Sequence, residues 1–303
     1  MKAMILAAGE GTRLKPLTDI CPKALVPVAN KPVIERLIAF LISHGVEEII
    51  VNAHHHYQRL LDYLKGDYEF GARVEVRLEK KILGTGGGIK NTQDFWDQAP
   101  FIVINGDILT DVDLEKAYDY HLKRENLLTL VLHDFPVHNK IMVDDDMNIL
   151  AIERGTNVSG ALAFTGIQIM SPAVLELIPE NQHYSIIECY ERIIREGRPI
   201  RGYRVTGHSW TDIGTIPDYL QANQRFVSAS TVAVGAECHI DPDARLAEWA
   251  VLGKGCAVER GALVERSVLW SDVIVRQGVR VVDSVVASGI VVETDLIGAV
   301  AVK

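Results

Sequence analysis

The sequence contains few cysteines and no long apolar run, and both absences narrow the class of protein. Its four cysteines, Cys21, Cys189, Cys238 and Cys256, form no Cys-x-x-Cys pair. This spacing argues against a zinc site built from cysteine pairs and fits reduced thiols. The longest apolar runs, such as residues 3–8, are well short of the roughly 18–20 residues that a membrane-spanning helix needs. We therefore expect a soluble, cytoplasmic protein without a membrane partner.

An excess of positive charge is also missing. The chain has 31 lysine and arginine residues against 40 aspartate and glutamate residues, which gives a net charge of -9. This balance disfavours a nucleic-acid partner, so a polyanionic ligand would need a local basic cluster. Hydrophobic residues make up 48% of the chain and charged residues 23%, a composition that is typical of a globular protein.

Up to about residue 225, short β-rich runs alternate with helical patterns. Strands are predicted at residues 3–7, 48–52, 74–78, 101–105 and 128–132, and helices at residues 34–44, 59–64 and 114–123. A hairpin at residues 141–152 and a strand at residues 162–170 follow. The alternation predicts a Rossmann-like α/β fold with a mixed, mostly parallel sheet, which binds ligands at the carboxyl ends of its strands.

The last part of the chain has a different composition and periodicity. Residues 231–303 contain 17 valines and little helical periodicity. Aliphatic residues recur every six positions, at Val234, Ile240, Leu246, Leu252, Val258 and Val264. This period predicts a left-handed parallel β-helix of about three coils at residues 231–303, after a catalytic domain at residues 1–227. The period breaks near residues 270–274, where we expect a protruding loop; a valine-rich β-sandwich is the alternative fold.

A glycine loop follows the first predicted strand. Residues 7–13 read Ala-Ala-Gly-Glu-Gly-Thr-Arg, and amide groups in such a turn can bind phosphate oxygens. Leu14 replaces the third glycine of a dinucleotide fingerprint, and no P-loop lysine follows. Residues 1–31 contain five basic and two acidic residues, a local charge of +3. The loop therefore fits a polyphosphate ligand, although the charges alone also suit a solvated surface loop.

These residues resemble the signature of a known family. Residues 6–18, Leu-Ala-Ala-Gly-Glu-Gly-Thr-Arg-Leu-Lys-Pro-Leu-Thr, and residues 22–28, Pro-Lys-Ala-Leu-Val-Pro-Val, look like that of the sugar-1-phosphate nucleotidylyltransferases. Members of this family join a nucleoside triphosphate to a sugar 1-phosphate and release pyrophosphate. The resemblance covers about residues 1–225. It implies these contacts: Ala8, Gly9, Gly11 and Thr12 with the nucleotide, Arg13 with the departing β- and γ-phosphates, and Lys23 with the attacking or attacked phosphate.

Transfer of this kind usually needs Mg2+ held by carboxylates. Asp107 follows a predicted strand within Asn105-Gly106-Asp107, and Asp212 lies within Trp-Thr-Asp-Ile-Gly-Thr at residues 210–215. The resemblance implies that Asp107 and Asp212 bind Mg2+. Taken singly, an aspartate at a strand end is as often a turn or capping residue.

A second glycine-rich segment lies at residues 83–89, Leu-Gly-Thr-Gly-Gly-Gly-Ile. It predicts three unencumbered amides at a helix start. The resemblance implies that Gly84, Thr85 and Gly86 surround the base and that Glu79 contacts its edge. Because a carboxylate only accepts hydrogen bonds, Glu79 would suit uracil, thymine or guanine. The alternative for Glu79 is an exposed strand charge beside Lys80 and Lys81.

The sugar site is less clear in the sequence. The resemblance implies that Asn105, Glu153, Arg154, Thr165 and Gly166 contact the sugar phosphate. In place of the family's Tyr-Gly after the fifth strand, residues 138–141 read His-Asn-Lys-Ile, which leaves the sugar open. The glycine-rich segment and this change resemble the muramate 1-phosphate uridylyltransferase and mannose 1-phosphate guanylyltransferase branches.

The function expected from the resemblance is Mg2+-assisted direct displacement, with UTP, GTP or dTTP and a sugar 1-phosphate as substrates. We expect a homo-oligomer, with the β-helix serving assembly or regulation. One alternative is a non-catalytic regulatory or scaffold subunit, against which the complete set of charged residues argues. Another is an acyltransferase tail, which is disfavoured because His239 is the only histidine after residue 208.

Overall fold

The computed structural model describes residues 1–66, 70–155, 158–227 and 231–303. These residues form two compact units: residues 1–10 with 36–210, and residues 11–35 with 211–303. The predicted boundary between a catalytic domain and a β-helix falls at residues 228–230, which lie outside the described ranges. Within those ranges, no helix has the length and apolar character needed to cross a membrane.

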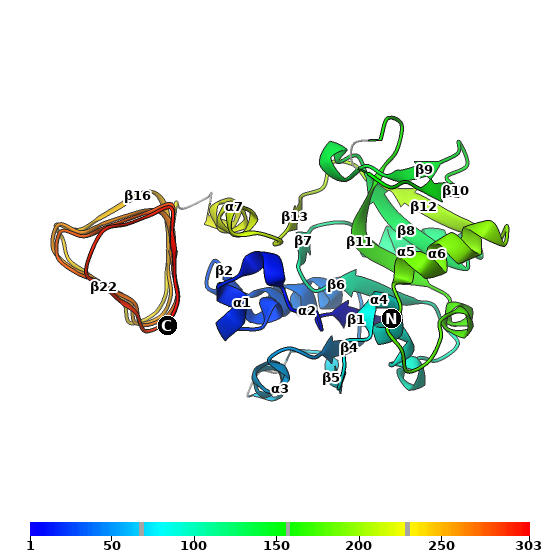
Figure 1. Ribbon diagram of the computed structural model, residues 1–303, viewed down its shortest axis with the longest axis horizontal. Coiled ribbons are helices and arrows are strands. Elements are labelled where there is room, and N and C mark those ends of the chain that lie inside the picture. The colour runs from blue at the N-terminus through cyan, green and yellow to red at the C-terminus, as the bar shows by residue number, and fades with distance from the viewer. Residues whose placement is uncertain (67–69, 156–157, 228–230) are drawn as a thin grey trace. The chain divides into compact units, whose positions relative to one another are not determined.

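The first unit is built around a seven-stranded sheet (Figure 1). Its order is β12-β8-β11-β6-β1-β4-β5, and every strand runs parallel to its neighbours except β11, which is antiparallel to β6 and β8. In chain order the strands are Lys2–Leu6 (β1), Glu48–Ala53 (β4), Arg73–Leu78 (β5), Phe101–Asn105 (β6), Leu128–His133 (β8), Ala163–Met170 (β11) and Ile200–Arg204 (β12). This mixed, mostly parallel sheet confirms the predicted fold class.

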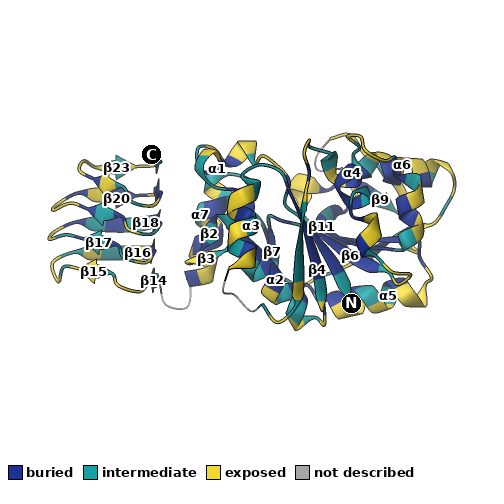
Figure 2. Ribbon diagram, turned by 90° about the horizontal axis from the view of Figure 1, so that it is seen from below, coloured by how far each residue is buried: buried dark blue, intermediate teal, exposed yellow. Residues whose placement is uncertain are grey.

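Helices and a hairpin complete this unit. The helices are Val33–Ser43 (α2), which begins in the second unit, Tyr57–Lys65 (α3), Gly84–Lys90 (α4), Leu114–Lys123 (α5) and Ile186–Arg195 (α6). The hairpin joins Ile141–Val143 (β9) to Ile149–Ile152 (β10), and a short strand, Ile108–Thr110 (β7), follows β6. The inner strands of the sheet are largely buried whereas α5 and α6 expose one side (Figure 2), as expected for parallel strands covered by amphipathic helices.

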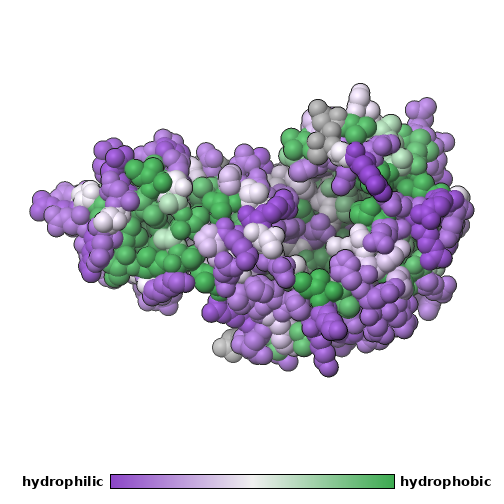
Figure 3. Space-filling model, in the orientation of Figure 1, coloured by the Kyte–Doolittle hydropathy of each residue, from purple (hydrophilic) through white to green (hydrophobic). Residues whose placement is uncertain are grey.

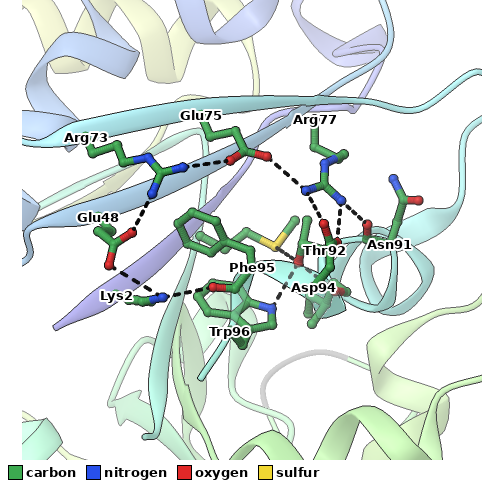
Figure 4. Close-up of polar contacts among 12 residues, drawn as sticks. Lys2, Glu48, Arg73, Glu75, Arg77, Asn91, Thr92, Asp94, Phe95 and Trp96 are labelled. Carbon is green, nitrogen blue, oxygen red and sulfur yellow. Dashed lines mark hydrogen bonds and ion pairs between the residues drawn. The ribbon is translucent and has the colours of Figure 1, made fainter. Parts of the chain in front are cut away.

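Strand β5 forms one edge of the sheet and carries a row of charges. Arg73, Glu75 and Arg77 alternate along β5 and therefore share a face. Arg77 donates to Asp94 at 2.7 Å and pairs with Glu75 at 2.9 Å. Figure 4 shows this chain of ion pairs above the aromatic rings of the segment after α4. Charges on an edge strand discourage pairing with another chain, and here they also hold that segment in place.

The second unit contains a parallel β-helix with three flat faces (Figure 1). One face stacks His239–Ile240 (β15), Ala257–Val258 (β17), Ile274–Val275 (β19) and Val291–Val292 (β22). The other faces contain Val232–Val234 (β14), Arg245–Leu252 (β16), Leu263–Leu269 (β18), Arg280–Val282 (β20), Val285–Val286 (β21), Leu296–Ile297 (β23) and Val300–Ala301 (β24). The layers are seen from the side in Figure 2.

The parallel stacking expected of a β-helix is present, but the protruding loop predicted at residues 270–274 is wrong. Arg245 pairs with Leu263, eighteen residues on, whereas Ala250 pairs with Ser267, seventeen residues on. The seventeen-residue spacing then continues, since Ala257 pairs with Ile274. The coil is therefore one residue shorter beyond Glu265, and nothing is inserted. Four stacked strands on one face also exceed the three coils expected.

Besides the β-helix, the second unit contains the N-terminal segment of residues 11–35 and one long helix. The N-terminal elements are 3-10 helices at Thr12–Leu14 and Lys23–Leu25, a short helix Leu17–Ile20 (α1), and a hairpin of Pro27–Val28 (β2) and Lys31–Pro32 (β3). Strand Trp210–Asp212 (β13) enters this unit at Thr211, and helix Ile216–Val227 (α7) follows.

Candidate active site

Four parallel strands of the first unit end at one edge of the sheet. Leu6 of β1 is in register with Asn52 of β4 and with Asn105 of β6. Beyond this row, the Ala7 amide donates to Asn52 Oδ1 at 2.8 Å. Gly106 continues from β6, and a Cβ there would lie 2.6 Å from the Leu6 carbonyl oxygen. Glycine therefore lets the chain pass close to β1 on its way to Asp107, which is half-buried.

Glu79 lies at this edge, directly after β5. Its side chain is buried, with 2% of the residue exposed, so the alternative of an exposed strand charge is wrong. Asn52 Nδ2 donates to Glu79 Oε1 at 2.6 Å, and the Leu83 amide donates to Oε2 at 3.0 Å. Both carboxylate oxygens therefore hold the ends of strands β1 and β4 and the segment before α4. Contact with a base stays a prediction.

The glycines of α4 are packed against the segment before α6. The amides of Gly86 and Gly87 both donate to the Tyr184 carbonyl oxygen, at 2.9 and 3.1 Å. The expectation of unencumbered amides at this helix start is therefore wrong. A Cβ at Gly88 would lie 2.7 Å from both Asn52 Nδ2 and Glu79 Oε1, and the Thr85 hydroxyl accepts a bond from the Ile186 amide. Nucleotide contacts of Gly84, Thr85 and Gly86 stay a prediction.

Two of the residues expected at the sugar phosphate lie together. Gly166 has a φ of 82°, and a Cβ at this position would lie 2.9 Å from Asn105 Nδ2. Thr165 is fully buried and its hydroxyl donates to the Val131 carbonyl. Thr165 therefore shapes the irregular part of β11 that presents Gly166 to Asn105.

The other expected pair, Glu153 and Arg154, is exposed after β10. Neither side chain contacts Asn105 or Gly166 within the described residues, so the structure does not bring the five expected residues into one group. The neighbouring residues 156–157 lie outside the described ranges.

An aromatic cluster occupies the end of β8, where the family's Tyr-Gly is replaced. Because β8 and β6 are both antiparallel to β11, His133 lies at the same sheet edge as Asn105. His133 Nδ1 is 3.1 Å from His208 Nε2, and the rings of Phe135 and Trp210 pack on His133. Burial, followed by the nearby His208, lowers the pKa of His133 to about 4. His133 is therefore neutral and buried here, packed against His208 and the two aromatic rings.

The second unit brings together the predicted cations and one predicted metal ligand. Arg13 Nη2 and Lys23 Nζ each lie 3.9 Å from an oxygen of Asp212. Gly214 leaves room for this arrangement, since a Cβ there would be 3.1 Å from Arg13 Nη1 and 3.2 Å from Asp212 Oδ2. Lys23 is mostly buried, whereas Arg13 exposes 66% of its side chain. Two cations therefore face one carboxylate.

The remaining lysines of the basic cluster have other partners. Lys15 pairs with Asp19 at 2.9 Å, and Lys31 pairs with Glu35 at 3.5 Å. Both pairs join residues four positions apart. Arg13 and Lys23 thus converge on Asp212, whereas Lys15 and Lys31 each pair with a carboxylate four positions on.

Backbone geometry fixes the Arg13 loop. Gly11 adopts a left-handed φ of 64° before the 3-10 helix, and the Thr18 hydroxyl donates to the Gly11 carbonyl at 2.9 Å. A Cβ at Gly11 would lie 2.8 Å from Thr18 Cγ2. Glycine is therefore needed here both for its φ and for the close approach of Thr18.

Asp212 is held by a well-defined helix start. Thr215 and Asp218 bond reciprocally, since the Thr215 amide donates to Asp218 at 3.0 Å and the Asp218 amide to the Thr215 hydroxyl at 3.4 Å. This capping box starts α7 three residues after Asp212. The Arg225 guanidinium also donates to the Thr211 hydroxyl at 2.6 Å. Helix α7 therefore fixes the strand that presents Asp212.

Sequence reasoning missed Asn52, the residue that links β1, β4 and Glu79. A signal was present, because residues 48–52, Glu-Ile-Ile-Val-Asn, end like residues 101–105, Phe-Ile-Val-Ile-Asn. A polar residue at the end of each buried strand marks the functional edge of a parallel sheet. Sequence reasoning also missed the pair of His133 and His208, because residues so far apart in the chain form no recognisable motif.

Comparisons with known proteins agree with this geometry. Residues 2–228 match the family model described as nucleotidyl transferase. The chain belongs to this family. The UTP–glucose-1-phosphate uridylyltransferase of Synechocystis is 29% identical over 94% of this chain and 87% of its own length. The N-acetylmuramate α-1-phosphate uridylyltransferase of Neisseria meningitidis is 33% identical over 71% of this chain and 94% of its own length.

A solved structure is similar as well. HddC from Yersinia pseudotuberculosis, in complex with GMP-PN, has a TM-score of 0.65 and 27% identity, and the match covers 74% of this chain and 99% of that chain. The predicted family, the sugar-1-phosphate nucleotidylyltransferases, and the predicted enzyme class are thereby confirmed.

Proposed function

We propose that the protein transfers a nucleotidyl group from UTP, GTP or dTTP to a sugar 1-phosphate. The observation that carries this proposal is the convergence of Arg13 and Lys23 on Asp212, which places two cations and a carboxylate beside a glycine loop. Such a set suits a reaction that needs positioning and charge stabilisation rather than a covalent intermediate. Two similar relatives named as uridylyltransferases favour UTP as the first donor to test.

Two carboxylates are the proposed ligands of a divalent cation. Among residues 1–66, 70–155, 158–227 and 231–303, no group of three or more histidine, cysteine, aspartate or glutamate side chains forms a metal cage. Mg2+ typically takes one or two carboxylates together with substrate phosphates. Asp107 and Asp212 are the two carboxylates that the family resemblance implies. We propose that these two aspartates hold Mg2+, which when bound would neutralise charge on the phosphate oxygens.

The proposed reaction is a direct displacement. An oxygen of the sugar 1-phosphate attacks the α-phosphorus, the bond from the α-phosphorus to the bridging oxygen breaks, and pyrophosphate leaves with the electron pair. Arg13 stabilises charge on the departing pyrophosphate, and Lys23 holds the attacking phosphate. Asn105 and Gly166 bind the sugar phosphate, with Glu153, Arg154 and Thr165 as further proposed contributors. Ala8, Gly9, Gly11 and Thr12 contact the nucleotide.

The base and the sugar are tested by a screen. Pyrophosphate release is measured with each of UTP, GTP, dTTP, ATP and CTP against a panel of sugar 1-phosphates, with and without Mg2+. Release with one uridine, guanosine or thymidine donor and one sugar phosphate, lost on chelation, supports the proposal. Release from no combination would favour the non-catalytic subunit instead.

We propose further that the chain forms a homo-oligomer through its β-helix. Apolar residues gather on the β-helix surface in Figure 3, and Val291 and Ile297 expose 41% and 58% of their surfaces. Light scattering after gel filtration tests this proposal with Ile297→Lys, which should shift the mass towards the monomer. An unchanged mass in that variant would remove this surface from the proposal.

A further inference from the structure

Helix α7 connects the β-helix to the segment that contains Lys23. The Tyr219 hydroxyl donates to the Pro27 carbonyl at 2.6 Å, and Trp270 Nε1 donates to that same hydroxyl at 3.0 Å. Trp270 follows β18 of the β-helix, and Pro27 begins β2, four residues after Lys23. One hydroxyl thus joins the two segments.

This contact is deeply buried. Tyr219 has no exposed surface and Trp270 exposes 7%. A tyrosine hydroxyl has one hydrogen to donate, so its donation to Pro27 is committed, and Trp270 fills an acceptor position. Removing the hydroxyl would leave both the indole N–H and the Pro27 carbonyl without this partner in a site that water does not reach.

Two further bonds hold the same hairpin. Asn223, one turn after Tyr219 on α7, accepts a bond from the Ala29 amide at 2.8 Å. Asn30 in the hairpin turn donates to the Leu252 carbonyl of the β-helix at 2.8 Å. Ala29 and Asn30 both adopt left-handed φ values, 43° and 65°. The hairpin therefore has a tight turn whose polar groups are directed to α7 and to the β-helix.

The position of Lys23 depends on this hairpin. The Lys23 carbonyl accepts the Val26 amide at 3.1 Å, and the Val26 carbonyl accepts the Val33 amide at 3.2 Å. These bonds make the 3-10 helix of Lys23 continuous with the hairpin. Lys23 itself exposes only 16% of its side chain, so a shift of the hairpin would change both its burial and its distance to Asp212.

We propose that Tyr219 and Trp270 are positioning residues, through which the β-helix holds Lys23 against Asp212. The β-helix then contributes to the active site of its own chain, in addition to any role in assembly. The proposal rests on the proposed function only where activity is measured.

The test compares Tyr219→Phe with Tyr190→Phe in the full chain. Tyr190 is an equally buried tyrosine whose hydroxyl donates to Gln168 in the first unit, so it is a matched control for the loss of a buried hydroxyl. Lys23 is probed by reductive methylation with formaldehyde and quantified by mass spectrometry. Lys116, which exposes 74% of its side chain, serves as the internal reference.

In Tyr219→Phe we expect Lys23 methylation to rise about threefold relative to Lys116, and amide exchange to accelerate in residues 23–28. Trp270→Phe should give a smaller change in the same direction, because Tyr219 can still donate to Pro27. The effects of the two substitutions should be less than additive, since both bonds use one hydroxyl. Tyr190→Phe should leave Lys23 methylation unchanged.

Activity gives a second measurement. Tyr219→Phe should lower kcat/KM for the sugar 1-phosphate about tenfold, since Lys23 holds the attacking phosphate in the proposed function. Lys23 methylation in Tyr219→Phe that equals that of wild type would overturn the positioning role, whatever the activity. Absence of any transferase activity in the wild-type chain would contradict the proposed function and leave the methylation test valid.

Discussion

The glycine-rich segments at residues 9–11 and 84–88 have different surroundings. A Cβ at Gly9 would meet nothing within 4 Å, whereas a Cβ at Gly87 would lie 2.6 Å from the Gln182 carbonyl oxygen. The first segment leads to Arg13, an exposed cation facing Asp212. The second is packed, and its amides at Gly86 and Gly87 are bonded to Tyr184. Glycine therefore leaves open backbone at Gly9, whereas at Gly11 and Gly87 it permits close packing.

The largest effect is expected from removing the cation of the first segment. Arg13→Ala should lower kcat/KM by about 30- to 1000-fold, or about 2 to 4 kcal/mol of transition-state stabilisation, because a preorganised charge is lost. Steady-state pyrophosphate release measures this. Lys15→Ala is the control, since Lys15 lies in the same loop but pairs with Asp19. Equal losses in both variants would contradict a specific role of Arg13, because the total positive charge of the loop would then explain the effect.

A substitution in the packed segment at residues 84–88 should lower the stability of the fold more than the rate of the reaction. Gly88→Ala should lower the free energy of unfolding by about 1 to 3 kcal/mol, because the added methyl group meets Asn52 and Glu79 at 2.7 Å. Urea unfolding measures the change. Gly9→Ala is the matched control and should unfold like the wild type. A stable Gly88→Ala variant would show that Asn52 and Glu79 can move apart.

Acid should destabilise the unit that contains the packed segment. Burial lowers the pKa of both His121 and His133 to about 4, so in this range the unfolded chain binds protons that the folded chain does not. Stability is therefore full near neutral pH and falls as the pH drops from about 6.5 towards 4. For His121, the loss between pH 7 and pH 5 is about 2 kcal/mol.

Urea unfolding at pH 7 and pH 5 checks this expectation. In His121→Gln the loss between the two pH values should be smaller by about that amount, because glutamine does not titrate. The same dependence on pH in wild type and variant would show that His121 binds its proton equally in the folded and unfolded chain.

The smallest effect is expected at the edge strand next to the packed segment. Arg77→Ala should lower stability by about 1 kcal/mol, because it removes the bonds to Asp94 and to the Asn91 carbonyl that hold the segment after α4. Arg73→Ala should cost less, since the Arg73 side chain is 69% exposed. Urea unfolding at low and high salt should show a larger difference at low salt.

Much of the fold could be predicted because the local patterns and the tertiary structure agree. The runs at residues 49–51 and 101–104 are apolar and each is followed by asparagine, which fits a buried parallel strand that ends at a functional edge. The six-residue period of aliphatic residues after residue 230 likewise indicated a β-helix. Its one-residue contraction after Glu265 was visible only as a break in the period, and a missing residue and an inserted loop interrupt a period in the same way.

The site was harder to predict because its contacts join distant segments. Sequence patterns identified Arg13, Lys23 and Asp212, and the structure brings these three together. They could not show that Tyr184 occupies the amides of Gly86 and Gly87, or that Asn52 takes an oxygen of Glu79. Such bonds depend on how loops meet at the sheet edge, and no local spacing specifies them.

The most direct test is Mg2+-dependent pyrophosphate release by the wild-type chain, Asp107→Asn and Asp212→Asn. Asparagine keeps the shape of each side chain and removes the charge that a hard cation requires. We predict robust release by the wild type and a loss of at least about 100-fold in each variant, with unchanged unfolding curves. Release at the wild-type rate by either variant would contradict an active site in which these carboxylates act with Arg13 and Lys23.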